Sequence, residues 1–169
     1  MNYYQSLGYL VLGSRLKRLS EVFLSEINKA YRAEGIVFET TWFPVFYLLS
    51  KNNSLSIQEL CEHIEVSHPA ASQLVTNLKS KGLVITATSP EDARKQLVKL
   101  SPEGKKLLKK ILPVWDAILE TMEEVAGGKP ESDLILKQLT TLETAFKSVN
   151  IVERIQEKIS QPIKPTADV

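Results

Sequence analysis

Apolar residues recur at helical spacing along most of this chain, and the pattern predicts six helices. The first covers about residues 4–32 and stops near Gly35, because glycine commonly follows the last turn of a helix. The second begins after Thr40 or Thr41. This start confines Pro44 to the first turn, where proline is tolerated.

The third and fourth helices have the clearest start signals. Ser56 and Glu59 form an S-x-x-E capping box, in which each side chain bonds the other residue's backbone N–H. After a short turn, Ser67 is placed to cap a helix that runs to about Lys81 and is followed by Gly82. The apolar stripe of this fourth helix, which we expect to be buried, consists of Ala71, Leu74, Val75 and Leu78.

A pair of strands is predicted after the fourth helix. Residues 83–88 and 95–100 are rich in β-branched and aliphatic side chains, and residues 89–94 between them contain turn-forming serine and proline. These segments predict a two-stranded hairpin with a narrow tip.

Two further helices complete the pattern. Ser101 and Pro102 mark the start of the fifth, as N-cap and first helical residue, and it reaches about Val125. Residues 127–130 break the chain, and apolar positions at helical spacing then continue to about residue 159.

These elements predict a mainly α-helical fold with a small two- to three-stranded antiparallel wing, that is, a winged helix-turn-helix plus a helical dimerisation region. We place one domain at residues 1–148, followed by an extension whose role the sequence does not assign. The predicted parts are the winged helix-turn-helix (about 37–101), the helix-turn-helix within it (about 56–81), the wing (about 83–100), the dimerisation helices (about 4–32 and 102–148), and an extension (149–169) that is helical to about 159 and then flexible.

Charge is unevenly distributed, although the whole chain carries a net charge of only +1. Residues 67–114 contain nine lysine or arginine residues and three carboxylates, a net charge of +6, whereas residues 1–66 and 115–169 carry −1 and −4. Such a segment attracts phosphates, although on charge alone a chance cluster on a solvated face is an equal alternative. The chain contains no apolar run of membrane-spanning length and one cysteine, so we expect a cytoplasmic protein without a membrane partner.

The face of the fourth helix opposite its apolar stripe is polar and carries no carboxylate. Gln73 and Asn77 can each bond an adenine edge through two hydrogen bonds, and serine or threonine hydroxyls can bond bases or phosphates. With no arginine on this face, we expect a modest preference for A·T base pairs. The alternative is a polar amphipathic helix without a ligand. The predicted contacts with double-stranded DNA from this helix are Ser67, His68, Ala71, Ser72, Gln73, Thr76, Asn77 and Lys79.

The predicted hairpin tip offers a second DNA contact. Arg94 is placed to enter the minor groove, where negative potential is concentrated, and Asp92 is placed to hold its guanidinium. Lys95 and Lys99 would contact adjacent phosphates. The alternative for Asp92 and Arg94 is an exposed salt bridge that contributes under about 1 kcal/mol.

Residues 55–104 resemble the multiple-antibiotic-resistance regulator (MarR) family of winged helix-turn-helix transcription regulators. The resemblance rests on Ser-Ile-Gln-Glu-Leu, Ser-His-Pro-Ala-Ala-Ser-Gln-Leu-Val, Lys-Gly-Leu-Val, Glu-Asp-Ala-Arg-Lys and Val-Lys-Leu-Ser-Pro-Glu-Gly, and the helix layout extends it to about residues 4–148. It implies a two-fold dimer that binds pseudo-palindromic operators and is often released by a small ligand or an oxidant. By position it implies base contacts from Ser72, Gln73, Thr76 and Asn77, and wing contacts from Asp92 and Arg94.

A homodimer is also expected from the residues themselves. Residues 4–32 and 131–159 carry more apolar positions than one thin module can cover, so the remaining faces need a partner. In a two-fold dimer the two DNA-binding heads would lie about 34–36 Å apart, one turn of DNA. The alternative is an intramolecular bundle, which predicts a monomer.

A small-molecule site is expected where the first two helices meet. There, aromatic side chains and one cation would suit a small aromatic or carboxylate effector, although filling of the core is an equal alternative for the aromatics. The residues of this predicted site are Tyr9, Arg15, Trp42, Phe46 and Tyr47.

Other chemistry has little support in the sequence. Cys61 lies on the expected core stripe of the third helix, which argues against a redox switch, and its spacing from Glu62, His63 and His68 does not suit zinc. We therefore expect no metal, no cofactor and no enzymatic activity. The main alternative to a DNA-binding regulator is a winged-helix module that binds another protein and has only non-specific affinity for DNA.

Overall fold

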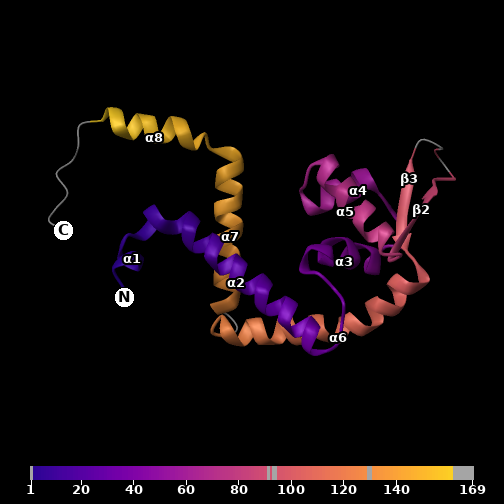
Figure 1. Ribbon diagram of the computed structural model, residues 1–169. Helices are drawn as coiled ribbons and strands as arrows, with labels where there is room; N and C mark the ends of the chain where they lie inside the picture. Colours follow the sequence, from indigo (N-terminus) through magenta and orange to yellow (C-terminus); the bar gives the residue numbers. More distant parts are fainter. Residues whose placement is uncertain (1, 91, 93–94, 129–130, 162–169) are drawn as a thin grey trace. The chain divides into compact units, whose positions relative to one another are not determined.

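The computed structural model describes residues 2–90, 92, 95–128 and 131–161, and it divides the chain into two compact units, residues 1–118 and 119–169. The predicted flexible tail after about residue 159 therefore falls mostly outside the described residues. Figure 1 labels the helices α1 to α8 and the strands β2 and β3. With the short strand β1 and the 3-10 turns η1 and η2, the elements are α1 (Tyr3–Ser6), η1 (Gly8–Val11), α2 (Leu12–Ala33), η2 (Thr40–Trp42), α3 (Phe43–Lys51), β1 (Leu55–Ser56), α4 (Ile57–Ile64), α5 (His68–Ser80), β2 (Val84–Thr88), β3 (Gln96–Leu100), α6 (Pro102–Val125), α7 (Glu131–Ser148) and α8 (Ile151–Ser160).

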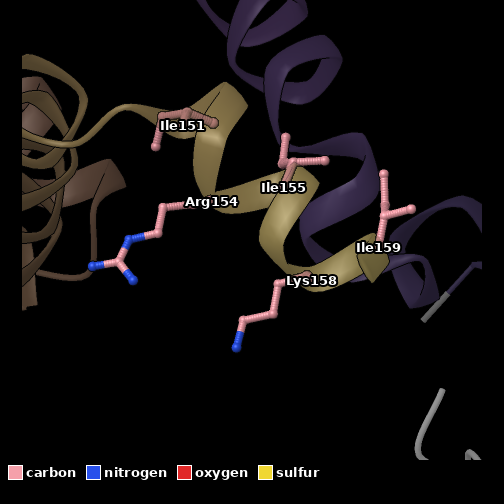
Figure 2. Close-up of a pocket in the computed structure, with 5 residues that line it drawn as sticks. All are labelled: Ile151, Arg154, Ile155, Lys158 and Ile159. Atoms are coloured by element: carbon pink, nitrogen blue, oxygen red, sulfur yellow. The ribbon is translucent and has the colours of Figure 1, made fainter. Parts of the chain in front are cut away.

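The second unit contains the end of α6 and the helices α7 and α8. The predicted sixth helix is divided here, because Asn150 caps a new helix by accepting a hydrogen bond from the Glu153 N–H at 3.2 Å. One side of α8 is apolar and is flanked by basic residues. Figure 2 shows Ile151, Ile155 and Ile159 along this side, with Arg154 and Lys158 beside them.

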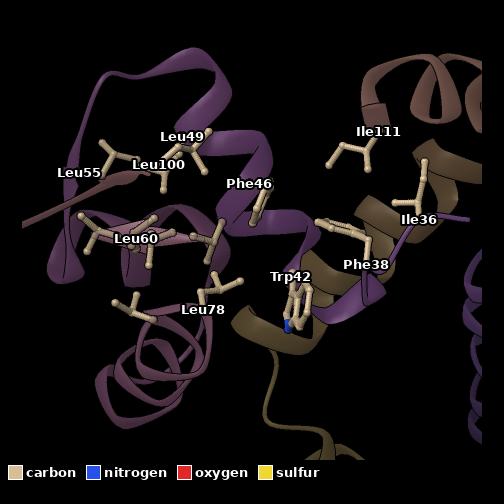
Figure 3. Close-up of a cluster of buried hydrophobic side chains, with 14 of the residues drawn as sticks. Ile36, Phe38, Trp42, Phe46, Leu49, Leu55, Leu60, Leu78, Leu100 and Ile111 are labelled. Atoms are coloured by element: carbon tan, nitrogen blue, oxygen red, sulfur yellow. The ribbon is translucent and has the colours of Figure 1, made fainter. Parts of the chain in front are cut away.

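The first unit is built around one hydrophobic core that draws residues from α2, α3, α4, α5, the sheet and α6. Phe38, in the loop after α2, lies at the aromatic end of this core (Figure 3). Its ring centroid is 4.9 Å from that of Tyr31, 5.1 Å from Phe46 and 5.7 Å from Trp42, each in an edge-to-face arrangement. These contacts join α2 to α3. Helices α4 and α5 pack on the opposite end of the core, through residues such as Leu60 and Leu78.

The predicted hairpin is present and forms part of a three-stranded antiparallel sheet with the strand order β1-β3-β2. Val84 pairs with Leu100 at the base of the hairpin, and Leu55 of the two-residue strand β1 pairs with Val98. The mainly helical fold class with a small antiparallel wing is thus confirmed. None of the helices within the described ranges is long and apolar enough to cross a membrane.

Two predicted helix starts were wrong. The first helix does not run unbroken from residue 4. Gly8 adopts φ +56° and begins the 3-10 turn η1, which separates α1 from α2. Thr40 does not cap the second helix. Its hydroxyl and its N–H instead bond the side-chain amide of Asn28, each at 3.2 Å, so residues 40–42 form a 3-10 turn before α3 begins at Phe43.

A polar contact at the aromatic end of the core joins α6 to α2. The indole N–H of Trp115 on α6 donates a hydrogen bond of 2.8 Å to the hydroxyl of Tyr31 on α2. Burial raises the pKa of Tyr31, and the bond from Trp115 acts in the opposite direction. The phenol therefore stays neutral at physiological pH and serves as an acceptor.

The substitution Trp115→Phe should lower the free energy of unfolding by about 1–3 kcal/mol, because it leaves the buried Tyr31 oxygen without its donor. Urea denaturation followed by circular dichroism measures this change. The double substitution with Tyr31→Phe removes both polar groups and should recover part of the stability. Equal stability of Trp115→Phe and the wild type would contradict the role of this bond.

Candidate nucleic-acid interface

Helices α4 and α5 form a helix-turn-helix with defined ends. The predicted capping box at the start of α4 is confirmed: Ser56 Oγ accepts from the Glu59 N–H at 3.2 Å, and Glu59 Oε2 accepts from the Ser56 N–H at 2.7 Å. Helix α4 ends at Ile64, and Glu65 adopts the left-handed conformation with φ 53°. This residue turns the chain within a few positions, so that α5 can pack against α4.

Helix α5 begins after Ser67, whose side chain caps it as predicted by accepting from the Ala70 N–H. The predicted apolar stripe faces the core, with Val75 and Leu78 buried and Leu74 partly buried. Ala71 belongs to the same stripe and is only 1% exposed. Its methyl group has no surface left for a base, so the expected DNA contact of Ala71 is corrected to a core position.

The outward face of α5 presents the predicted polar residues to solvent. Gln73, Thr76 and Asn77 are exposed, and among the residues that the structure describes neither amide side chain makes a hydrogen bond. The Thr76 hydroxyl donates to the Ser72 carbonyl at 2.8 Å, and Ser72 Oγ lies 3.3 Å from His68 Nδ1. The two amides are therefore available to an external partner, while the hydroxyls are held in place and keep lone pairs for accepting.

Lys79, in the last turn of α5, lies against the hairpin. Its Nζ donates a 3.1 Å hydrogen bond to Oγ1 of Thr86, which is in the middle of β2. Thr86 was not among the predicted site residues, because only the packing of α5 on β2 reveals which residue of the strand meets the lysine. This hydrogen bond places an ammonium group where the end of α5 and the hairpin meet.

The base of the hairpin tip is closed by backbone hydrogen bonds. The Lys95 N–H donates to the Asp92 carbonyl at 2.9 Å, and the Ser89 N–H donates to the Lys95 carbonyl at 2.8 Å. Lys95 and Lys99 are exposed, as a phosphate contact requires. Arg94 lies outside the described residues, so its predicted pairing with Asp92 stays a prediction.

The aromatic residues of the predicted small-molecule site divide into buried and exposed ones. Trp42 and Phe46 are buried in the core, where neighbouring rings cover them. Tyr47 is exposed and stacks on Phe43 at 5.6 Å between centroids, and both rings contact Trp115. Phe43 was missed because the sequence pattern did not separate buried from exposed aromatics on α3. Trp115 was missed because it lies on α6, far from α3 in the sequence.

The remaining members of that predicted site are exposed. Tyr9 lies on η1 and Arg15 on α2. Neither residue is joined to Tyr47 by a ring contact or a hydrogen bond within the described part of the chain, so a shared site stays a prediction.

Cys61 is half-buried rather than fully buried on α4. In the described part of the chain, no group of three or more histidine, cysteine or acidic side chains is arranged to hold a metal ion. The spacing of Cys61, Glu62, His63 and His68 therefore corresponds to no such cluster.

Glu59 has a pKa below its usual value of 4.5. The main cause is the hydrogen bond from the Ser56 N–H, followed by the bond from the Ser56 hydroxyl, with smaller contributions from the charges of Lys95 and His63. Since the folded state lowers this pKa, the ionised capping box stabilises the fold above pH 4.5, and this stability is lost as the pH falls through the folded-state pKa.

The substitution Glu59→Ala should lower the melting temperature at neutral pH, because the Ser56 N–H loses its charged acceptor. The difference from the wild type should narrow as the pH falls below about 4.5, where Glu59 becomes protonated. Thermal denaturation at a series of pH values measures both effects. A difference that stays constant between neutral and acidic pH would show that the Glu59 charge does not contribute.

Comparison with known proteins matches this helix-turn-helix and hairpin. A model of the MarR family matches residues 38–95, which include α3, α4, α5 and the hairpin up to Lys95. The HTH-type transcriptional regulator FarR of Neisseria gonorrhoeae is 33% identical over 95 residues. Residues 38–95 are thus similar to the MarR family. The aligned region is 56% of this chain and 64% of FarR, so it spans less than two-thirds of that relative.

Solved structures share the fold of this chain. The S. aureus MepR–DNA complex is 16% identical, with a TM-score of 0.69 over 79% of this chain and 97% of MepR. Bordetella bronchiseptica BpsR, described with the regulation of its DNA binding by 6-hydroxynicotinic acid, is 19% identical, with a TM-score of 0.64 over 79% of this chain and 92% of BpsR. At these identities the likeness concerns the fold.

Proposed function

We propose that this chain is a MarR-type DNA-binding transcription regulator that acts as a homodimer on pseudo-palindromic operators. In this proposal α5 contacts base edges in the major groove, and the hairpin of β2 and β3 contacts the neighbouring backbone and minor groove. A small aromatic or carboxylate effector releases the operator. The protein works in the cytoplasm and carries out no catalytic step.

The observation that carries the proposal is the outward face of α5. Burial of Val75 and Leu78 turns Gln73 and Asn77 toward solvent, and both amides lack an intramolecular partner among the described residues. A side-chain amide offers a donor and an acceptor together, as the major-groove edge of adenine requires. The absence of a carboxylate from α5 lets this face approach phosphates without repulsion.

Phosphate affinity is supported by the cations around this face. Lys79 lies where α5 meets the hairpin. Lys95 is exposed just before β3, and Lys99 is exposed on β3. Ser67 and His68 stand at the start of α5, where the positive end of the helix dipole suits a phosphate. We propose that these groups and Arg94 supply most of the affinity, while Gln73 and Asn77 supply a modest preference for A·T base pairs.

A homodimer is supported by the exposed apolar face of α2. This face is unusual for a solvated helix, since Leu19 alone is 66% exposed. Burial of such side chains against a second copy removes them from water and sets two DNA-binding heads at a fixed separation. The exposed apolar residues of α2 are Leu16, Leu19, Val22, Phe23 and Leu24.

An effector site is supported by the exposed aromatic surface of α3. Phe43 and Tyr47 are 39% and 44% exposed and stack on each other beside Trp115. Stacked rings at a surface suit a flat aromatic ligand. We therefore shift the proposed site from Trp42 and Phe46 toward Phe43, Tyr47 and Trp115, and retain Arg15 and Tyr9 as proposed partners of a carboxylate.

DNA binding is tested by selecting duplexes from a random library and titrating the best one at several salt concentrations. Arg94→Ala should weaken binding to all duplexes and reduce the slope of log affinity against log salt by about one for each phosphate that is no longer neutralised. Gln73→Ala should instead relax the preference at one base position, at a cost of about 1–3 kcal/mol. Lys137→Ala on α7 removes the same charge outside the proposed interface and should change neither property.

Unchanged affinity in Arg94→Ala, or affinity that falls little with salt, would contradict DNA binding by this surface. Salt-insensitive, weak DNA binding together with a stable complex with another protein would favour the alternative module. Selected sites rich in G·C pairs at the positions contacted by α5 would overturn the A·T preference alone. Repeating the selection with phenolic acids tests whether an effector releases the duplex.

The homodimer is tested by Leu19→Glu, which places a charge in the proposed apolar interface. The wild type should sediment as a dimer, and the variant should sediment as a folded monomer, because burying an unpaired carboxylate is unfavourable. Lys17→Glu on the same helix, an exposed and already charged position, is the matched control and should remain dimeric. A monomeric wild type would support the intramolecular bundle.

A further inference from the structure

The chain leaves α5 through a turn that exposes two backbone carbonyls to the next helix. Gly82 adopts φ +70°, its N–H donates to the Lys79 carbonyl at 2.9 Å, and the Leu83 N–H donates to the Leu78 carbonyl at 3.0 Å. This is the Schellman arrangement, in which a glycine ends the helix and satisfies its last carbonyls. The carbonyls of Gly82 and Leu83 are themselves left to find donors.

Ser101 supplies both of these donors. Its N–H donates to the Leu83 carbonyl at 3.0 Å, and its hydroxyl donates to the Gly82 carbonyl at 2.6 Å. The same hydroxyl accepts from the Gly104 N–H at 2.9 Å and so caps α6. Because Ser101 is only 2% exposed, water cannot replace these three bonds.

Gly104 allows the two backbones to come this close. A Cβ atom at this position would lie 2.0 Å from the Leu83 carbonyl oxygen and 3.1 Å from its carbon. Both are backbone atoms of a turn already held by hydrogen bonds, so they cannot move aside cheaply. The first turn of α6 therefore packs directly on the turn that ends α5.

The joint between these two turns connects elements with different roles in the proposed function. Helix α5 carries the outward face with Gln73 and Asn77, whereas α6 is bonded through Trp115 to Tyr31 of α2, the helix whose exposed apolar face is the proposed dimer interface. The neighbouring hydrogen bond of Lys79 with Thr86 is exposed and involves a flexible side chain. The buried bonds of Ser101 are thus the stronger constraint on the direction of α5.

We propose that Ser101 and Gly104 are positioning residues that fix the direction of α5 relative to α6, and thereby set the half-site spacing that the dimer accepts. This inference rests on the proposed function. Neither residue is among the proposed DNA contacts. Adding or removing one base pair changes the distance between the half-sites by about 3.4 Å along the duplex axis. A rigid joint prevents α5 from adjusting to this change, whereas a loosened joint allows it.

The test uses the full chain and the duplex selected by the wild type, with one base pair added or removed between its half-sites. The wild type should bind these two altered duplexes about tenfold more weakly than the selected one. In Ser101→Ala this ratio should shrink to about twofold, because the loosened joint lets α5 adjust. Ser101→Thr keeps the hydroxyl and should restore most of the discrimination.

Ser56→Ala is the matched control. Ser56 is also a buried serine that caps a helix, but it lies at the start of α4, away from the joint. Both alanine variants should melt at lower temperature than the wild type, and binding is measured at a temperature where circular dichroism shows both to be folded. Of these two variants, only Ser101→Ala should lose discrimination between half-site spacings.

The outcomes separate this inference from the function on which it rests. A wild type that binds no duplex overturns the proposed function. A wild type that discriminates between spacings while Ser101→Ala discriminates equally well overturns the inference alone. An equal decrease of discrimination in Ser56→Ala also overturns it, since general destabilisation would then account for the effect. Gly104→Ala should lose discrimination in the same direction as Ser101→Ala, and unaltered discrimination in a folded Gly104→Ala protein counts against the joint.

Discussion

Burial of one stripe of α5 is the constraint on which the rest of the DNA-binding head depends. Val75 and Leu78 are almost fully removed from water, and each such side chain contributes on the order of 1.5–3 kcal/mol. Turning the helix by one residue would bring Ser72 and Thr76 into the core and expose the apolar side chains. The polar face of α5 is therefore as well determined as the core itself, and its direction is then limited by the buried bonds of Ser101.

In the proposed function, affinity and specificity are assigned to different parts of this head. The lysines at the end of α5 and beside the hairpin provide charge without base discrimination, whereas the two amides provide hydrogen-bond patterns with little charge. Because these lysines are clustered, a chain with a net charge of only +1 can present a positive surface locally. It also separates the expected effects of changing a cation from those of changing an amide.

Much of the fold could be predicted because its signals are local. The capping box of Ser56 and Glu59, the cap at Ser67 and the strand pattern after Gly82 each lie within a few residues, and the structure confirms them. The mistaken start at Thr40 has a distant cause, since its partner Asn28 lies on α2. A residue 12 positions away offers no periodic signal in the sequence.

The candidate site was predictable to the same extent. Helical periodicity along α5 was enough to identify Gln73 and Asn77 as exposed and to place Ala71 on the buried stripe. The burial of Ala71 decides against the DNA contact that was also expected of it. The roles of Thr86 and Gly104 can be recognised only from their contacts with other elements, Thr86 with Lys79 of α5 and Gly104 with the turn at Leu83. The sequence pattern thus could not predict contacts between elements that are distant in the chain.

The outward face of α5 is proposed to contact base edges, and the side-chain amide groups of Gln73 and Asn77 report on this contact directly. Their ¹⁵N–¹H NMR signals can be followed as a selected duplex is added to the labelled protein. Both amide signals should shift, and those of Gln138 and Gln156 on α7 and α8 should not. Unchanged signals from Gln73 and Asn77 in a saturated complex would contradict contact between α5 and base edges.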